Sequence, residues 1–337
     1  MRRSPRARGH TAVRAELAGL WSRVLGAEPG PRDTFTALGG SSLAVEETIV
    51  ASRTVLVQPL TVADFADDPT LDEQADRVLR RHRREFGSGD TSCQQLRPGA
   101  PAVYCFAGAG ASAAWYLPLV AALTGPGTAD LAVYGVQAHG LHSRARVSWT
   151  VRGAARRYRR QLTASGGSGP YLLVGHSFGG IVALETARLL HADGCRVERV
   201  VLLDTVVDAD AALHRWTEGQ EGFAETTPDR LPRPVRLAAD LARALGAGLV
   251  RYHPAQQKQV FWALGMRAQR GHRIRVPAGV PVTVLLTADA PGQEPRWQEL
   301  GVAPEHIHSV PGGHLSMITE PAVLTAIETA LVAAPTQ

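Results

Sequence analysis

The sequence is poor in cysteine, and its first residues lack the apolar segment of a secretory signal. Its 337 residues include three cysteines, Cys93, Cys105 and Cys195, which are too few and too widely spaced for a disulfide framework or a zinc site. Free cysteines are typical of a reducing compartment, so we expect a cytoplasmic protein. The chain starts with several arginines, but no apolar segment follows them, and we therefore expect no secretory signal peptide.

Lysine is nearly absent as well. Lys258 is the single lysine, so arginine supplies almost all of the positive charge behind the formal net charge of +5. We interpret this as a coding preference for arginine, because no zinc finger, RNA-recognition signature or basic segment interleaved with aromatic residues accompanies it. We therefore expect no nucleic-acid partner. An arginine cluster over residues 152–160 is expected to be a solvated helix surface, with a docking face for an acidic partner as the alternative.

Charged residues are missing between Pro98 and Ala129, a stretch long enough to span a bilayer. Glycine and proline interrupt this stretch at residues 108–110, at Pro118 and at residues 125–127. Such interruptions favour a strand, a glycine-rich turn and a buried helix over a membrane span. We therefore expect no membrane segment, and no residue cluster indicates a metal site.

The first part of the chain shows helical patterns separated by turn residues. These patterns cover residues 11–26, 42–50, 62–65 and 70–84. Thr70 stands where the cap of the last helix is expected. The patterns predict a small four-helix bundle over residues 8–85. The segment that follows begins with small, polar residues, which predicts a linker over residues 86–98.

Strands alternate with helical patterns over residues 99–335. The expected strands are residues 102–106, 131–136, 171–174, 197–203, 280–286 and 307–310. This alternation predicts an α/β fold, a largely parallel sheet with helices on both faces. Between about residues 208 and 275 no convincing strand occurs. An insertion of this size is expected to form a helical lid over the sheet edge.

The segment GHSFG at residues 175–179 matches the nucleophile-elbow motif G-x-S-x-G. An apolar strand precedes it and a helical pattern follows it, which is the context that the motif requires in an α/β-hydrolase fold. Ser177 is therefore the candidate nucleophile. The backbone amide of Phe178, at the start of the helix, is expected to bind a developing oxyanion. A second amide is expected at Ala109, in the glycine-rich loop after the first strand.

A serine nucleophile needs a base and an acid that orients the base. His314 follows the last expected strand after the segment PGG at residues 311–313, on a loop at the carboxyl edge of the sheet, and is the candidate base. Asp204 and Asp289 both follow strands, at the carboxyl edge of the sheet where the active sites of open sheets lie. Position alone does not choose between these two carboxylates.

The region from about residue 101 to residue 331 resembles the type I thioesterases that end nonribosomal peptide and polyketide synthetases. The resemblance rests on residues 105–110, 169–171, 175–180, 202–204 and 313–317. It implies release of an acyl chain through an acyl-serine intermediate. It also favours Asp204 as the acid, because the family usually places the acid after the strand that follows the elbow helix. Stand-alone editing thioesterases more often use the later position, here that of Asp289.

Residues 33–43, with the sequence DTFTALGGSSL, resemble the attachment site of a peptidyl carrier domain. The resemblance implies that Ser42, which directly precedes the leucine, receives 4'-phosphopantetheine from a phosphopantetheinyl transferase. A helix cap is the alternative role of Ser42.

The two resemblances together predict a carrier–thioesterase didomain of natural-product biosynthesis, acting on nonribosomal peptides or hybrid polyketides. Upstream synthetase modules or other proteins are expected to load the carrier with an acyl or peptidyl thioester, which is released by hydrolysis or macrocyclisation. The alternatives are an editing thioesterase that clears stalled carriers in trans and a non-catalytic acyl shuttle. Five lid aromatics are expected to pack chiefly within the lid, with the lining of an acyl pocket as the alternative. They are Trp216, Phe223, Tyr252, Phe261 and Trp262.

Overall fold

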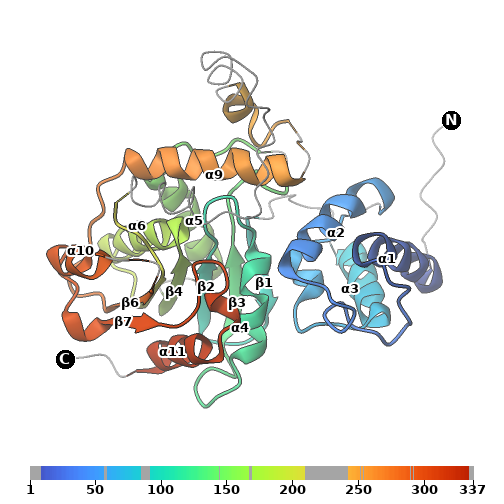
Figure 1. Cartoon of the computed structure of the whole chain (residues 1–337), viewed down its shortest axis with the longest axis horizontal. Helices are drawn as coiled ribbons and strands as arrows, with labels where there is room; N and C mark the ends of the chain where they lie inside the picture. Colours follow the sequence, from blue (N-terminus) through green and yellow to red (C-terminus); the bar gives the residue numbers. More distant parts are fainter. Residues whose placement is uncertain are drawn as a thin grey trace. The chain divides into compact units, whose positions relative to one another are not determined.

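The computed structural model describes residues 9–56, 59–84, 92–143, 145–166, 169–208, 242–250, 252, 254–288, 290 and 292–333. The chain divides into two compact units, residues 1–89 and residues 90–337, and each is described by itself. Figure 1 shows helices in the first unit and a sheet covered by helices in the second. No helix within the described ranges is long and apolar enough to cross a membrane.

The described residues of the first unit form three α-helices and one turn of 3-10 helix. They are α1 (His10–Leu25), α2 (Ser42–Val55), η1 (Val62–Phe65) and α3 (Leu71–Arg84). Helical structure therefore occurs where the four patterns predicted it, although the third is a single turn. The α1 helix packs against both α2 and α3. Phe35 packs edge-on against Trp21 and Phe65 and joins the centre of this unit.

Side-chain hydrogen bonds fix the interior and one end of these helices. Trp21 and Gln74 are fully buried, and the indole Nε1 of Trp21 donates to Gln74 Oε1 at 3.0 Å. The hydroxyl of Thr70 accepts the amide of Glu73, whose carboxylate accepts the amide of Thr70 in return. This reciprocal pair is a capping box, so Thr70 caps α3 as predicted.

A seven-stranded sheet forms the centre of the second unit, in the order β1-β3-β2-β4-β5-β6-β7. The strands are β1 (Cys93–Arg97), β2 (Ala102–Phe106), β3 (Ala132–Val136), β4 (Tyr171–His176), β5 (Val197–Leu203), β6 (Val282–Thr287) and β7 (Ile307–Val310). All neighbouring strands are parallel except β1 and β3. The prediction of a largely parallel sheet is therefore confirmed.

Helices cover both faces of this sheet. Figure 1 shows α5 (Val151–Gly166) and α6 (Phe178–Ala192) on one face and α4 (Leu117–Ala122) and α11 (Pro321–Val332) on the other. The remaining short elements are η2 (Ala113–Tyr116), α10 (Gln293–Glu299), η3 (Pro304–His306) and η4 (Met317–Thr319). Every residue of β4 and β6 is buried, as expected for parallel strands that are covered on both faces.

The predicted linker over residues 86–98 is wrong for its second half, because Cys93–Arg97 forms β1. This edge strand has alternating burial, with Gln94 and Leu96 buried and Gln95 exposed. Three of its five residues are polar, so no apolar run marks it in the sequence. The second unit therefore begins before residue 99, where the sequence predicted its start.

Arg97 ties this edge strand to the neighbouring loops. Its guanidinium donates to the carbonyl oxygens of Leu131 at 3.1 Å, Val120 at 3.2 Å, Leu123 at 2.7 Å and Thr128 at 2.7 Å. A planar group with several donors suits this convergence of acceptors, which a lysine would not match.

Only part of the predicted lid over residues 208–275 lies within the described residues, namely residues 208, 242–250, 252 and 254–275, which include α9 (Pro254–Arg270). Residues 209–241, with Trp216 and Phe223, lie outside them. The α9 helix packs against α6. Phe261 belongs to a small buried cluster, and Tyr252 packs against that cluster, which agrees with the expected role inside the lid.

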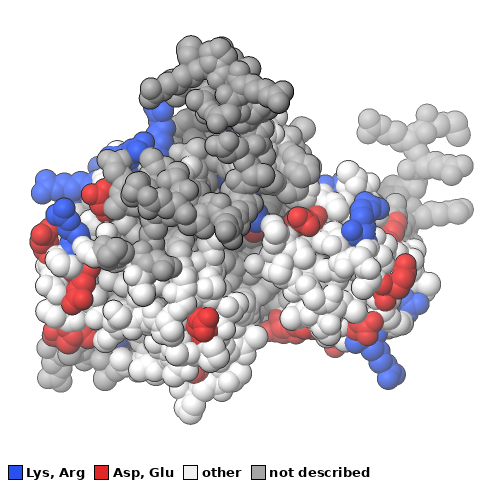
Figure 2. Space-filling model, in the orientation of Figure 1, with Lys and Arg blue, Asp and Glu red and all other residues white. Residues whose placement is uncertain are grey.

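On the face drawn in Figure 2, acidic and basic side chains are interspersed. The arginine cluster lies on α5, where Arg152, Arg156 and Arg160 are exposed and Arg159 forms an ion pair with Asp193. This agrees with the expected solvated helix surface.

We expect Arg97→Met to destabilise the second unit by about 2–3 kcal/mol, because a charged donor is lost from several carbonyl oxygens while the apolar stem is retained. Hydrogen exchange of β2 and β3 peptides in the full chain measures this loss. Gln95→Met, at an exposed position of the same strand, is the matched control. Equal exchange in the two variants would contradict the anchoring role of Arg97.

Candidate active site

A strained turn between β4 and α6 holds Ser177. Its φ of 52° and ψ of −127° are rare for a residue with a side chain. The motif glycines permit this turn. A Cβ at Gly175 would lie 2.4 Å from the Cα of Gly180, and a Cβ at Gly179 would lie 2.2 Å from the carbonyl oxygen of Phe106. Ser177 therefore stands at the carboxyl end of β4 on a tight turn, as the motif predicted.

His314 reaches this serine from the loop after β7. Its Nε2 lies 3.0 Å from Ser177 Oγ, and its Nδ1 lies 2.5 Å from Asp204 Oδ2. Because an ionised carboxylate can only accept, we assign the imidazole proton to Nδ1, which leaves Nε2 to accept the serine proton. The structure thus joins Ser177, His314 and Asp204 in one hydrogen-bonded series that has the geometry of a nucleophile, a base and an orienting acid.

Asp204 is fully buried after the end of β5, and both of its carboxylate oxygens have partners. Oδ1 accepts the backbone N–H and the hydroxyl of Thr287, each at 3.0 Å, while Oδ2 faces His314. These charge-assisted bonds fix the orientation of the carboxylate. Sequence reasoning missed Thr287, whose only signal is a hydroxyl at the end of the neighbouring strand. Asp289, the alternative acid, lies outside the described residues.

The two expected oxyanion residues lie close together near the nucleophile. Phe178 is the first residue of α6, and Ala109 belongs to the turn after β2. A Cβ at Gly265 of α9 would lie 2.7 Å from Ala109 Cβ and 3.3 Å from the Phe178 ring, so α9 packs on both. A Cβ at Gly108 would lie 3.4 Å from Ser177 Cβ. The loop therefore passes beside the serine, and the role of the two amides stays a prediction.

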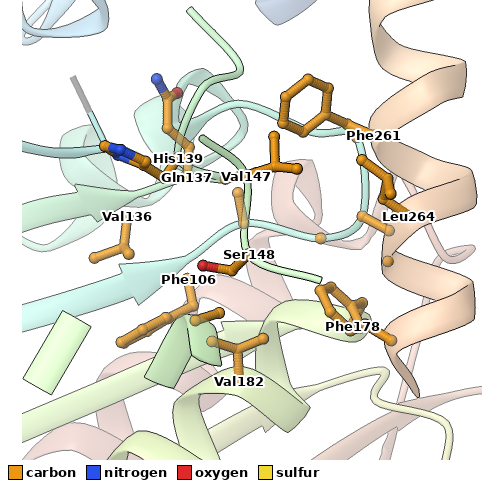
Figure 3. A pocket seen from close by; sticks show the side chains of 18 of the residues that line it. Phe106, Val136, Gln137, His139, Val147, Ser148, Phe178, Val182, Phe261 and Leu264 are labelled. Carbon is orange, nitrogen blue, oxygen red and sulfur yellow. The ribbon is translucent and has the colours of Figure 1, made fainter. Parts of the chain in front are cut away.

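A largely apolar pocket adjoins these residues, between α6, α9 and the loops after β2 and β3 (Figure 3). The apolar residues of its wall that Figure 3 labels are Phe106, Val136, Val147, Phe178, Val182, Phe261 and Leu264. The polar residues that it labels are Gln137, His139 and Ser148. Phe261 thus belongs both to the lid cluster and to the pocket wall. A pocket of this kind suits an apolar or aromatic group.

In the first unit, Ser42 is the exposed first residue of α2. The helix cap is the preceding residue, Ser41, whose hydroxyl accepts the amide of Ala44 at 3.3 Å. The alternative role of Ser42 as the cap is therefore wrong. A Cβ at Gly40 would lie 2.2 Å from the ring of Phe35, so only glycine lets the chain pass this close to the core before the helix begins.

The sheet, the elbow and the series of serine, histidine and aspartate define an α/β-hydrolase. Residues 101–331 match the family model described as a thioesterase domain. This match covers more than half of the chain, and the protein belongs to the thioesterase-domain family. Residues 15–78 match the model described as a phosphopantetheine attachment site, so the first unit is a carrier domain for that group.

The curated relatives are long synthetases of which this chain spans a small part. It is 31% identical to malpinin synthetase of Mortierella alpina over 199 residues, which are 58% of this chain and 2% of that protein. It is 30% identical to tyrocidine synthase 3 of Brevibacillus parabrevis over 215 residues, which are 64% of this chain and 3% of that protein.

Two solved structures show the same fold. A holo four-domain nonribosomal peptide synthetase, AB3403, bound to AMP and glycine, matches 100% of this chain with 27% of its own length, at a TM-score of 0.54 and 20% identity. The NocB thioesterase domain from the nocardicin cluster matches 71% of this chain with 98% of its own length, at a TM-score of 0.52 and 19% identity.

We expect Asp204→Asn to lower kcat for thioester hydrolysis by about 10³-fold or more, because an amide in place of the carboxylate favours the wrong imidazole tautomer. Asp289→Asn is the matched control and should leave kcat near the wild-type value. Steady-state hydrolysis of a small acyl thioester, with circular dichroism as a folding check, compares the two variants. The reverse order of damage would move the acid to Asp289.

Proposed function

We propose that this protein carries an acyl or peptidyl thioester on Ser42 and releases the chain through an ester on Ser177. The observation that carries the proposal is the hydrogen-bonded series of Ser177, His314 and Asp204 in a chain that also has a phosphopantetheine attachment domain. The similarity to peptide synthetases supports a place in nonribosomal peptide or hybrid polyketide biosynthesis, after modules that load the carrier.

The start of α2 fits the phosphodiester of a phosphopantetheine arm. Ser42 is exposed there, and the N–H groups of the first helical turn together with the helix dipole favour a phosphate. Ser41 already caps the helix, so modification of Ser42 does not remove the cap. When attached, the arm supplies a terminal thiol that holds the acyl chain as a thioester.

In the second unit, Ser177 Oγ attacks the thioester carbonyl while its proton passes to His314 Nε2. Asp204 holds the imidazole in the tautomer that accepts this proton and stabilises the imidazolium that forms. The amides of Phe178 and Ala109 are the proposed donors to the oxyanion. His314 then gives its proton to the departing sulfur, which leaves an ester on Ser177 and a free thiol.

The second half of the reaction frees Ser177. Water, or a hydroxyl or amine of the bound chain itself, gives a proton to His314 and attacks the ester carbonyl. The Ser177 oxygen then takes that proton back as the ester breaks. Water yields a free acid, whereas an internal nucleophile yields a macrocycle. We assign to the lid, which includes α9, the control of water access that selects between them.

The contact of His314 with Asp204 favours chain termination over editing, because the family resemblance links this acid position to terminating enzymes. A phosphopantetheinyl transferase is the proposed modifying partner. The cytoplasm is the proposed location, since Cys93, Cys105 and Cys195 form no disulfide with one another.

We expect the protein to gain the mass of one 4'-phosphopantetheine when it is incubated with coenzyme A and a promiscuous phosphopantetheinyl transferase. Ser42→Ala should gain nothing, because it lacks the hydroxyl that accepts the arm. Ser41→Ala, at the adjacent exposed serine, is the matched control and should be modified like the wild type. Intact-mass spectrometry measures the mass gain of all three proteins. Modification of Ser42→Ala, or of none of them, would refute the proposed attachment residue.

We expect Ser177→Ala to abolish release while leaving attachment of the arm intact. An acyl-phosphopantetheine loaded from acyl coenzyme A by the same transferase should then persist on the variant and disappear from the wild type. Intact mass over time measures both proteins. Equal persistence on the two would support the acyl shuttle, and equal loss would reject Ser177 as the nucleophile.

A further inference from the structure

His176 and Trp115 form a stacked pair next to His314. The centroids of the two rings lie 3.9 Å apart with an interplanar angle of 17°, and both residues are buried. The His176 ring also lies 4.7 Å from the ring of His314. The proposed mechanism uses neither of these side chains, so their position beside the base calls for a separate explanation.

Each ring of the pair hydrogen-bonds the backbone of the loop that carries the base. His176 Nε2 lies 2.9 Å from the carbonyl oxygen of His314 itself. Trp115 Nε1 donates to the carbonyl oxygen of Leu315 at 3.3 Å. Because a carbonyl oxygen only accepts, His176 Nε2 carries a proton in this arrangement. Side chains from two other parts of the fold thus hold two successive carbonyl groups of the loop.

The loop is half-buried at residues 312–314 and exposed at residues 315 and 316, and its backbone bonds are largely local. Leu315 is 51% exposed although it directly follows the base. The amide of Gly313 donates to the hydroxyl of Ser316, and the amide of Met317 donates to the carbonyl oxygen of Gly313. These local bonds shape a turn but do not attach it to the sheet. The His314 side chain holds the turn through Asp204 and Ser177, and the two ring N–H groups add attachment of its backbone.

The two rings have firm supports of their own. Trp115 lies in η2, where the amide of Ala113 donates to Gln137 Oε1 at 3.0 Å and the hydroxyl of Tyr116 donates to the carbonyl oxygen of Phe106 at 2.7 Å. His176 is the last residue of β4 and immediately precedes Ser177 in the chain. Its backbone is therefore fixed relative to Ser177, and a hydrogen bond from its ring to the loop of His314 also fixes that loop relative to Ser177.

We propose that His176 and Trp115 are positioning residues, which hold the backbone of His314 and Leu315 so that His314 Nε2 stays within hydrogen-bond distance of Ser177. Neither side chain is assigned a contact with the reacting atoms. The inference rests on the proposed function, because it assumes that His314 acts as the base. Supports of this kind around a catalytic group keep it in its productive geometry.

Substitutions that keep a ring and remove its donor test this proposal. We expect His176→Phe and Trp115→Phe each to lower kcat for thioester hydrolysis by about 10- to 100-fold with KM little changed, by analogy with the loss found when the hydrogen-bond partner of a metal-binding histidine is removed. His176→Gln has a side-chain amide that can donate, and it should recover most of the loss. Equal losses in His176→Phe and His176→Gln would overturn the proposed hydrogen bond. Trp149→Phe and His191→Phe make the same exchanges at exposed sites and serve as controls.

Reaction with a fluorophosphonate separates positioning from folding. Ser177 Oγ attacks phosphorus, fluoride leaves and the proton passes to His314. The rate constant of labelling therefore depends on how well His314 is placed to accept this proton. The final extent of labelling gives the fraction of protein whose site is folded. We expect His176→Phe to reach the wild-type end point at a rate about 10- to 100-fold lower. A wild-type rate at any end point would overturn the positioning role. No label on the wild type, or label on Ser177→Ala, would instead refute the proposed function.

Discussion

The parallel register of β4, β5 and β6 determines where the reactive groups of the second unit lie. His176 pairs with Leu203, and Leu203 pairs with Leu285. The ladder continues for one residue, since Ser177 N–H donates to the carbonyl oxygen of Leu203 at 2.8 Å and Asp204 N–H donates to that of Leu285 at 2.7 Å. Both residues then turn to positive φ values, 52° and 46°. Such backbone costs about 1–3 kcal/mol for each residue, and it persists because the adjoining strands fix both sides. A register slip of one residue would shift Ser177 relative to Asp204, the proposed orienting acid.

Two serines at helix starts use their hydroxyls in different ways. In α2, the hydroxyl of Ser41 caps the helix, and Ser42 follows it on the surface. In α6, Ser177 occupies the N-cap position, but its side chain makes no capping bond and contacts His314 instead. A helix N-terminus favours negative charge in both places, a phosphodiester in one and an oxyanion in the other. In the proposed function, the same backbone property serves attachment in one unit and cleavage in the other.

Features with local steric demands could be predicted from the sequence. The elbow requires glycine on both sides of Ser177, and a base after the last strand must reach the same sheet edge, so His314 was found as well. The choice between Asp204 and Asp289 needed coordinates or family knowledge, because both follow parallel strands. The contact of Trp115 with the loop that carries His314 could not be predicted, since the carbonyl group that Trp115 binds belongs to a residue 200 positions further along the chain. The polar edge strand β1 was missed for a similar reason, because it is stabilised by pairing with β3 and not by an apolar pattern of its own.

Glycine at two positions sets how closely α9 approaches the loop beside the nucleophile. A Cβ at Gly110 would lie 2.4 Å from the carbonyl oxygen of Lys258, and a Cβ at Gly265 would lie 2.7 Å from Ala109 Cβ. Helix and loop therefore meet almost backbone to backbone, with no flexible side chain between them to compress or rotate away. A single methyl group at either glycine would act as a spacer. The distance between α9 and the loop therefore depends on both positions having a hydrogen atom in place of a Cβ.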